Sequence, residues 1–243
     1  MEIIKIKVNL PIKVYELLMH DAKAFGFVKE DGTINKNKFI NVLINNYFSI
    51  FCKLEEKVIS SVNGQIKLKD EDYPLISSIY FETKYKKEGN YDKDLQFIVS
   101  KFNENIMDEI LYVQLKNRSI SQYFRDLFIL YSSNISEDRE KIIFSNVVNK
   151  IKDVIEDKTK AYIILKNNEK MLVDIFSLAD TQEEIFCYVI GVKEQNDKRT
   201  IISLHLKDIS NVIELSNQKR SFAPKEDEKL RLMELQNPAF AIN

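Results

Sequence analysis

The chain has 243 residues, which is enough for two or three small domains with cores of their own. It is 44% hydrophobic and 30% charged, as folded globular proteins are, and its formal net charge of −1 excludes a chain that is polybasic throughout. Residues 1–53 carry eight Lys against five acidic side chains, so attraction to phosphate groups is expected at that end.

Two cysteines, Cys52 and Cys187, stand far apart in apolar surroundings, which predicts reduced thiols and a cytoplasmic protein. No apolar run approaches the length of a membrane span, and residues 1–5 lack the apolar segment of a signal peptide. We therefore expect neither a secreted protein nor a membrane partner.

The first 53 residues have the pattern of a strand followed by two helices. Apolar and polar residues alternate from residue 4 to residue 10, with Lys5, Lys7 and Asn9 on the polar side, which is the period of a half-buried strand. Pro11 suits the first turn of a helix, and Asn35 is expected to cap the start of a second helix.

The opening pattern recurs after a charged connector, in which residues 75–85 fit either a short helix or a strand. The second unit begins with a strand over residues 95–101, and two helices follow. An offset of 92 residues aligns the two units and turns three residues of the second strand outward: Phe97, Val99 and Lys101. The two units could pair within one chain as a pseudo-dimer, because one such unit cannot bury its apolar face alone.

Beyond residue 135 the period changes from that of helices to that of strands. Ser136 opens a third long helix, with an apolar stripe from residue 143 to residue 155. A charged helix is expected over residues 226–235. Between these helices lie five expected strands, whose spacing is typical of a small β-barrel: residues 161–166, 170–176, 184–191, 200–206 and 209–215.

These patterns predict an α+β fold, because helical segments alternate with strands that join through short turns. The expected segments are a strand-helix-helix unit (1–53), a connector (54–92), a second such unit (93–134), a barrel domain with its leading helix (135–220) and a C-terminal helical segment (221–243).

Catalytic motifs are scarce. The five glycines make no phosphate-binding loop, and His20, His205 and the two cysteines lack metal-ligand spacing. Carboxylate-x-Lys triplets resembling fragments of a nuclease motif fall on predicted helices or the connector, at residues 55–57, 156–158 and 227–229. Such triplets arise by chance at this charge content, so we expect no enzyme, no metal and no cofactor.

The polar side of the first strand is the candidate nucleic-acid contact. A two-stranded ribbon can enter the major groove of DNA, where lysine donates to guanine and asparagine pairs with adenine. The helix after Asn35 could bring its backbone N–H groups, with Lys36 and Lys38, to a phosphate. The same pattern also fits a solvated strand face and an ordinary capped helix.

The run of residues 5–11 and the helix at Asn35 resemble the ribbon-helix-helix family of DNA-binding repressors over about 50 residues. In that family two chains each supply one strand to an antiparallel ribbon, and the second helix contacts phosphate with its N-terminus. The resemblance implies that the residues in contact with nucleic acid are Lys5, Lys7, Asn9, Asn35, Lys36 and Lys38.

The region 142–215 resembles a WYL domain, a small Sm/SH3-like barrel named for a Trp-Tyr-Leu tripeptide. Residues 186–191 correspond to that tripeptide and keep its tyrosine as Tyr188, and residues 199–209 are similar to the family's arginine-containing strand. The resemblance implies a pocket for nucleic acid or a charged ligand at Tyr188, Arg199 and His205. Asp208 departs from the family, where a basic residue is common.

The order of the segments, and the junction at residues 131–144, resemble WYL accessory proteins of type VI-D, RNA-targeting CRISPR systems. The lead hypothesis is a nucleic-acid-binding regulator, transcriptional or CRISPR-associated, that forms a homodimer, as both families commonly do. One alternative is a single-stranded-RNA-binding accessory protein that modulates a CRISPR effector. The other is an oligomerisation scaffold that binds no nucleic acid.

Overall fold

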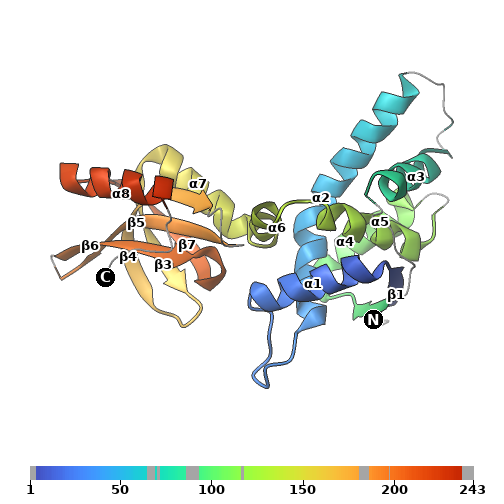
Figure 1. Ribbon diagram of the computed structural model, residues 1–243, viewed down its shortest axis with the longest axis horizontal. Helices are drawn as coiled ribbons and strands as arrows, with labels where there is room; N and C mark the ends of the chain where they lie inside the picture. Colours follow the sequence, from blue (N-terminus) through green and yellow to red (C-terminus); the bar gives the residue numbers. More distant parts are fainter. Residues whose placement is uncertain are drawn as a thin grey trace. The chain divides into compact units, whose positions relative to one another are not determined.

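The computed structural model describes residues 4–64, 69, 72–85, 93–115, 118–180, 186–196 and 198–236. It divides into two compact units, Met1–Ile135 and Ser136–Asn243, which are called unit 1 and unit 2 (Figure 1). Helices and antiparallel sheets occur in both units, so the expected α+β class is confirmed. None of the described helices combines the length and apolar character that crossing a membrane requires.

Unit 1 contains the order strand-helix-helix twice, with one further helix between the two copies. That helix occupies the segment for which the sequence left helix and strand open. A π-helical turn, Ile110–Gln114, directly follows the helix that ends at Glu109. The elements are β1 (Lys5–Leu10), α1 (Ile12–Ala24), α2 (Lys36–Asn63), α3 (Tyr73–Tyr85), β2 (Lys93–Ile98), α4 (Glu104–Glu109) and α5 (Ile120–Ser132).

The two strands of unit 1 pair with each other as an antiparallel ribbon, with Lys7 opposite Gln96 at its centre. The inner face of the ribbon is apolar and at most 3% exposed: Ile6, Val8, Leu95 and Phe97. Phe97 packs edge-on against Phe124 of α5, with ring centroids 5.4 Å apart. The strands are therefore held to the helices by burial of one face, as the alternation of β1 predicts.

The outward face of β2 was predicted wrongly. Phe97 is 2% exposed and lies on the inner face, whereas Asp94, Gln96 and Ile98 point outward. The central pair relates the two strands by an offset of 89 residues, which takes Lys7 to Gln96, and not by the even offset of 92. A shift by an odd number of residues exchanges the two faces of a strand, so the alignment through the helices assigned Phe97 to the wrong face. Val99 and Lys101, the other two residues expected to point outward, lie beyond the end of β2.

Unit 2 contains one antiparallel sheet in the order β6-β5-β4-β3-β7. The predicted long helix is two helices, because the backbone leaves helical geometry at Phe144 (φ −105°, ψ 24°). The elements are α6 (Ser136–Ile143), α7 (Ser145–Asp157), β3 (Thr159–Leu165), β4 (Lys170–Asp180), β5 (Cys187–Gln195), β6 (Lys198–His205), β7 (Ile209–Lys219) and α8 (Pro224–Gln236).

The sheet of unit 2 is covered on both faces. Val189 belongs to an apolar cluster with the buried side of α7, and its neighbour Ile190 belongs to a second cluster with Leu230 of α8. Successive residues of a strand point to opposite faces, so α7 and α8 cover opposite sides. The expected closed barrel is not formed by the described strands, because β6 and β7 are unpaired edges of an open sheet.

Candidate nucleic-acid interface

The outer face of the ribbon carries the side chains that the sequence assigned to it. Lys5 and Lys7 are exposed, and Asn9 is half-buried. Opposite them on β2 stand Ile98, Gln96 and Asp94, respectively, all exposed. Lys7 and Asp94 form an ion pair, with Nζ 2.8 Å from Oδ2, and both side chains remain about half exposed.

Sequence reasoning missed Asp94 and Gln96 as residues of this face. The signal was available in the segment 93–98, where Leu95 and Phe97 alternate with polar neighbours. Alternation within the strand itself decides which side is buried, whereas alignment through the following helices cannot resolve a shift of one residue.

The ribbon is held in place by a buried amide at the start of α2. Asn41, 1% exposed, donates from Nδ2 to the carbonyl oxygen of Ile98 (2.8 Å). Its Oδ1 accepts from the backbone N–H of Ser100 (2.7 Å) and from Nδ2 of Asn103 (3.1 Å). One turn earlier, Asn37 accepts from the N–H of Ile98 (2.7 Å). The N-terminus of α2 therefore lies beside the end of the ribbon that carries Lys5.

The second helix of each copy begins with a side-chain cap. Asn35 accepts from the backbone N–H of Lys38 (3.2 Å), and Ser119 accepts from that of Gln122 (3.1 Å). Asn35 is thus a helix cap, and its oxygen occupies an N–H group that a phosphate would otherwise contact. Lys36 is half-buried and Lys38 is exposed at the same helix start.

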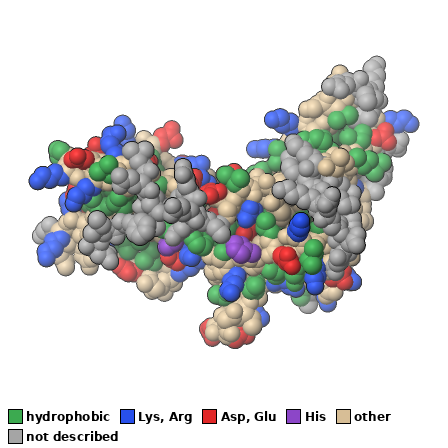
Figure 2. All heavy atoms as spheres, viewed as in Figure 1, with side chains coloured by type: hydrophobic (Ala, Val, Ile, Leu, Met, Phe, Trp, Pro, Cys, Tyr) green, Lys and Arg blue, Asp and Glu red, His purple; other side chains and the backbone are tan. Residues whose placement is uncertain are grey.

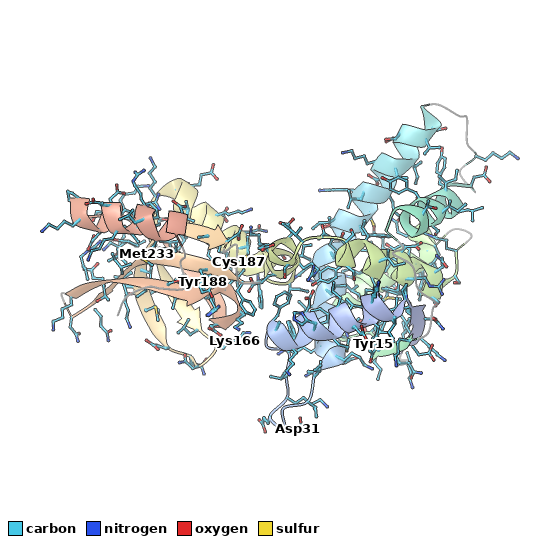
Figure 3. All side chains as sticks on the ribbon, in the orientation of Figure 1. Tyr15, Asp31, Lys166, Cys187, Tyr188 and Met233 are labelled. Carbon is cyan, nitrogen blue, oxygen red and sulfur yellow. The ribbon has the colours of Figure 1, made fainter. Side chains whose placement is uncertain are left out.

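Basic side chains do not gather into one patch on the face shown in Figure 2, where Lys and Arg are spread over both units. Attraction to a polyanion at the ribbon would therefore come from a few cations at defined positions. At the loop before α2, Asp31 accepts from the hydroxyl of Thr33 (2.6 Å) and from the Thr33 N–H (2.9 Å), and these bonds hold the pKa of Asp31 below its usual range (Figure 3).

Two of the three predicted WYL-pocket residues lie together in unit 2. Tyr188 on β5 pairs with His205 on β6, and their ring centroids are 4.4 Å apart. Phe186 contacts the other side of His205, at 5.5 Å between centroids, and Lys207 Nζ lies 4.0 Å from the Phe186 ring centroid. Tyr188 is 3% exposed, so it forms part of the wall of this aromatic cluster.

Arg199, the third predicted pocket residue, is not brought to this cluster. It pairs with Glu194, six positions along β5 from Tyr188, which is roughly 20 Å at the rise of a strand. Its guanidinium donates to Glu226 of α8 (3.0 Å) and to the buried carboxylate of Asp174 (3.1 Å). These bonds raise the pKa of Arg199 and tie α8 to the sheet.

A buried carboxyl group of unit 2 joins α6 to the start of β5. Glu140 is fully buried and accepts from the backbone N–H of Cys187 (2.5 Å), which Figure 3 places next to Tyr188. Burial raises the pKa of Glu140 to about 7, although this hydrogen bond acts in the opposite direction. Burial also raises the pKa of the Cys187 thiol, so it is an unreactive thiol.

A buried ionic group of unit 1 joins α2 to α5. Arg118 donates to both carboxylate oxygens of Glu55 (2.5 and 3.2 Å) and lies 3.4 Å from Asp126. Burial raises the pKa of Asp126 to about 6, against the hydrogen bond from Ser78. A cavity of about 220 Å³ borders Glu55 and Arg118. Among the described residues, no group of three or more His, Cys, Asp or Glu is placed to hold a metal ion.

Comparison with known proteins finds similarity in structure and none in sequence. No family model matches the chain, and no curated protein matches it. A solved structure described as a CRISPR Cas-related protein superposes with a TM-score of 0.71, covering 99% of this chain and 73% of that chain. The two chains are 12% identical, so the likeness shows a shared fold.

Proposed function

We propose that this protein is a nucleic-acid-binding regulator with a CRISPR-associated role, and that its ribbon reads duplex DNA as in ribbon-helix-helix proteins. One observation carries the proposal: a two-stranded ribbon buries its apolar face and presents Lys5, Lys7 and Gln96 on the other, with Asn9 half-buried beside them. Such a ribbon fits the major groove, where those side chains can donate to base edges. The likeness to a CRISPR Cas-related protein supports the CRISPR association.

The helix starts beside the ribbon would contact the phosphates. The bond from Ile98 to Asn37 keeps the first turn of α2 at one end of the ribbon, where Lys36 and Lys38 lie. Cations at such positions neutralise phosphate charge without reading sequence, and so they fix the register of the protein on the duplex.

Unit 2 would be a WYL-type module that binds a ligand and adjusts the activity of unit 1. The partly exposed rings of Phe186 and His205, with Lys207 over Phe186, offer an aromatic and cationic surface for such a ligand. The proposal includes neither catalysis nor a cofactor.

The second candidate is a single-stranded-RNA-binding accessory protein that modulates an RNA-targeting CRISPR effector, which the structural likeness also favours. Single-strand binding relies on aromatic rings that stack on bases and on free cations. Tyr188 is buried and Arg199 is held by two carboxylates, so neither side chain is presented for such contacts. The duplex proposal therefore has the stronger structural support.

A binding titration of the purified protein tests the proposal. Matched duplex DNA, single-stranded DNA and single-stranded RNA are compared at low and at physiological salt, because phosphate contacts weaken as salt rises. We expect the duplex to bind best, and Lys5→Ala and Asn9→Ala each to reduce the discrimination between duplex sequences about 10-fold.

Lys152→Ala is the matched control, since it removes an exposed lysine from α7 in unit 2 and should leave the affinity unchanged. Preference for single-stranded RNA would replace the proposal with the accessory-protein candidate. Absence of binding to any of the three at low salt, together with stable self-association, would leave the scaffold hypothesis.

A further inference from the structure

We propose that one chain reads a single, non-palindromic duplex DNA site, with Asp94 and Gln96 as the specificity-determining residues of the second strand. This inference rests on the proposed function and deepens it. It follows from the chemistry of the ribbon's outer face, which is composed of two different strands of the same chain.

The ribbon has an approximate twofold axis through its central pair, Lys7 and Gln96. Rotation about that axis takes Lys5 to Asp94 and Asn9 to Ile98. Each outward position is therefore matched by a residue of different chemistry. The basic side chain of Lys5 is matched by the acidic side chain of Asp94, and the amide of Asn9 by the aliphatic side chain of Ile98. The backbone is symmetric, but the reading groups are not.

A palindromic DNA site is recognised by a symmetric dimer. When two identical chains supply the ribbon, every reading group occurs twice, and the recognised site is an inverted repeat. Here β1 and β2 come from one chain and share no outward residue at equivalent positions. The ribbon is complete without a second copy, so one chain is expected for each site.

The two ends of the ribbon present different hydrogen-bonding groups to the groove. Lys5 and Ile98 form one end, with a donor for guanine and an aliphatic group for the thymine methyl. Asn9 and Asp94 form the other end, where the Oδ1 of the half-buried Asn9 amide is inaccessible and the Asp94 carboxylate can accept from cytosine N4. Gln96 at the centre can pair with adenine in two hydrogen bonds.

Asp94 contributes to sequence specificity by disfavouring some bases as well as by binding others. A carboxylate in the groove can only accept, and of the base edges only the amino groups of cytosine and adenine donate there, so Asp94 disfavours guanine and thymine. In the ion pair of Asp94 with Lys7, both side chains are exposed. Exposed pairs contribute little stability, so both side chains can turn to bases at small cost.

Selection from a duplex library with a randomised central segment, using the full-length protein, tests the inference. We expect an enriched motif without an inverted repeat, occurring once in each bound duplex. Gln96→Ala should weaken binding to the selected duplex about 10-fold, and should change binding to a scrambled duplex less than about twofold. Asp94→Asn should relax the preference at one base pair only.

Asp153→Asn, which removes an exposed carboxylate from α7, is the charge-matched control for Asp94→Asn. If Asp94 only repels phosphates, Asp94→Asn will raise affinity for every duplex equally, and the inference fails. An inverted-repeat motif with two chains per site, or duplex binding without any enriched motif, overturns the inference and leaves the proposed function standing. Absence of duplex binding overturns both.

Discussion

Asn41, a buried residue that holds the ribbon, bonds to the carbonyl oxygen of Ile98, the last residue of β2. It also accepts from the N–H of Ser100, which lies just beyond the strand. It therefore satisfies the polar groups where β2 ends and the chain turns toward α4. Buried polar groups of this kind cost free energy when they lose their partner.

Asn41→Ala should lower the free energy of unfolding by about 3 kcal/mol, because it leaves the Ile98 carbonyl and the Ser100 N–H without their partner. Asn45→Ala, one turn further along α2, removes an exposed amide and should change stability by less than about 0.5 kcal/mol. Urea unfolding midpoints measure both. Equal midpoints for the two variants would show that the buried amide contributes nothing.

The raised pKa of Glu140 predicts that the stability of unit 2 depends on pH. Its pKa is about 7 in the folded chain and falls to its ordinary value of 4.5 on unfolding. Between these values the folded chain holds a proton that the unfolded chain has lost, so the free energy of unfolding falls as pH rises. The loss between pH 5 and pH 7.5 amounts to about 2 kcal/mol.

Glu140→Gln should remove this part of the pH dependence, since the amide cannot ionise and still accepts from the Cys187 N–H. Unfolding of both proteins at pH 5 and pH 7.5 gives the comparison, and the variant should gain about 2 kcal/mol relative to the natural chain at the higher pH. Asp138→Asn, which removes an exposed carboxylate from the same helix, is the control. If the difference in the free energy of unfolding between the two proteins is the same at both pH values, Glu140 does not cause the pH dependence.

At the scale of elements, local sequence patterns predicted the positions of strands better than they predicted where helices end. The alternation of β1 predicted its buried face, and the strands of unit 2 lie where their periods placed them, β4, β5 and β7 extending further. The break between α6 and α7 was missed, because an apolar stripe continues through Phe144 at helical spacing. A stripe predicts which side is buried and carries no information about where the axis turns.

Gly191 is a position where β5 lies close to the backbone of β4. It lies opposite Ile175, where β4 has a register shift, and a Cβ there would stand 2.5 Å from the carbonyl oxygen of Asp174. Gly191→Ala should therefore push β4 from β5 and lower stability by about 3 kcal/mol.

Gly64→Ala is the matched control at the end of α2, where the backbone is helical and an added Cβ meets its nearest atom at 3.5 Å. It should be neutral or stabilising by about 0.5 kcal/mol, because alanine restricts the unfolded chain. Thermal or urea unfolding checks both variants. A neutral Gly191→Ala would mean that β4 can shift freely at the bulge.

At the scale of the whole molecule, each unit carries its own core. The apolar clusters of unit 2 lie within residues 144–233, and the ribbon of unit 1 pairs β1 with β2 and packs on α5 of the same unit. The expectation of a homodimer rested on the resemblance to two families whose members commonly pair. In ribbon-helix-helix proteins each chain supplies one strand, whereas here one chain supplies both. Dimerisation through another surface stays a prediction.

A chain of residues 1–135 should fold by itself and bind duplex DNA with the same sequence preference as the full protein. The physical reason is that the ribbon, the Asn41 contacts and both capped helices lie within this unit. Circular dichroism checks folding, and the titration described above checks binding. Residues 136–243 should fold and show no such preference, and a sequence preference that resides there would contradict the assignment.

The sequence by itself determined the local features: the α+β class, the polar face of β1, the cap at Asn35 and the five strands of unit 2. These follow from periods and caps that act over a few residues. Only the tertiary structure decided that β1 pairs with β2, which face of β2 points outward, that the sheet stays open, and that Arg199 lies far from Tyr188 and His205. Those outcomes depend on contacts between distant segments, whose register no local period specifies.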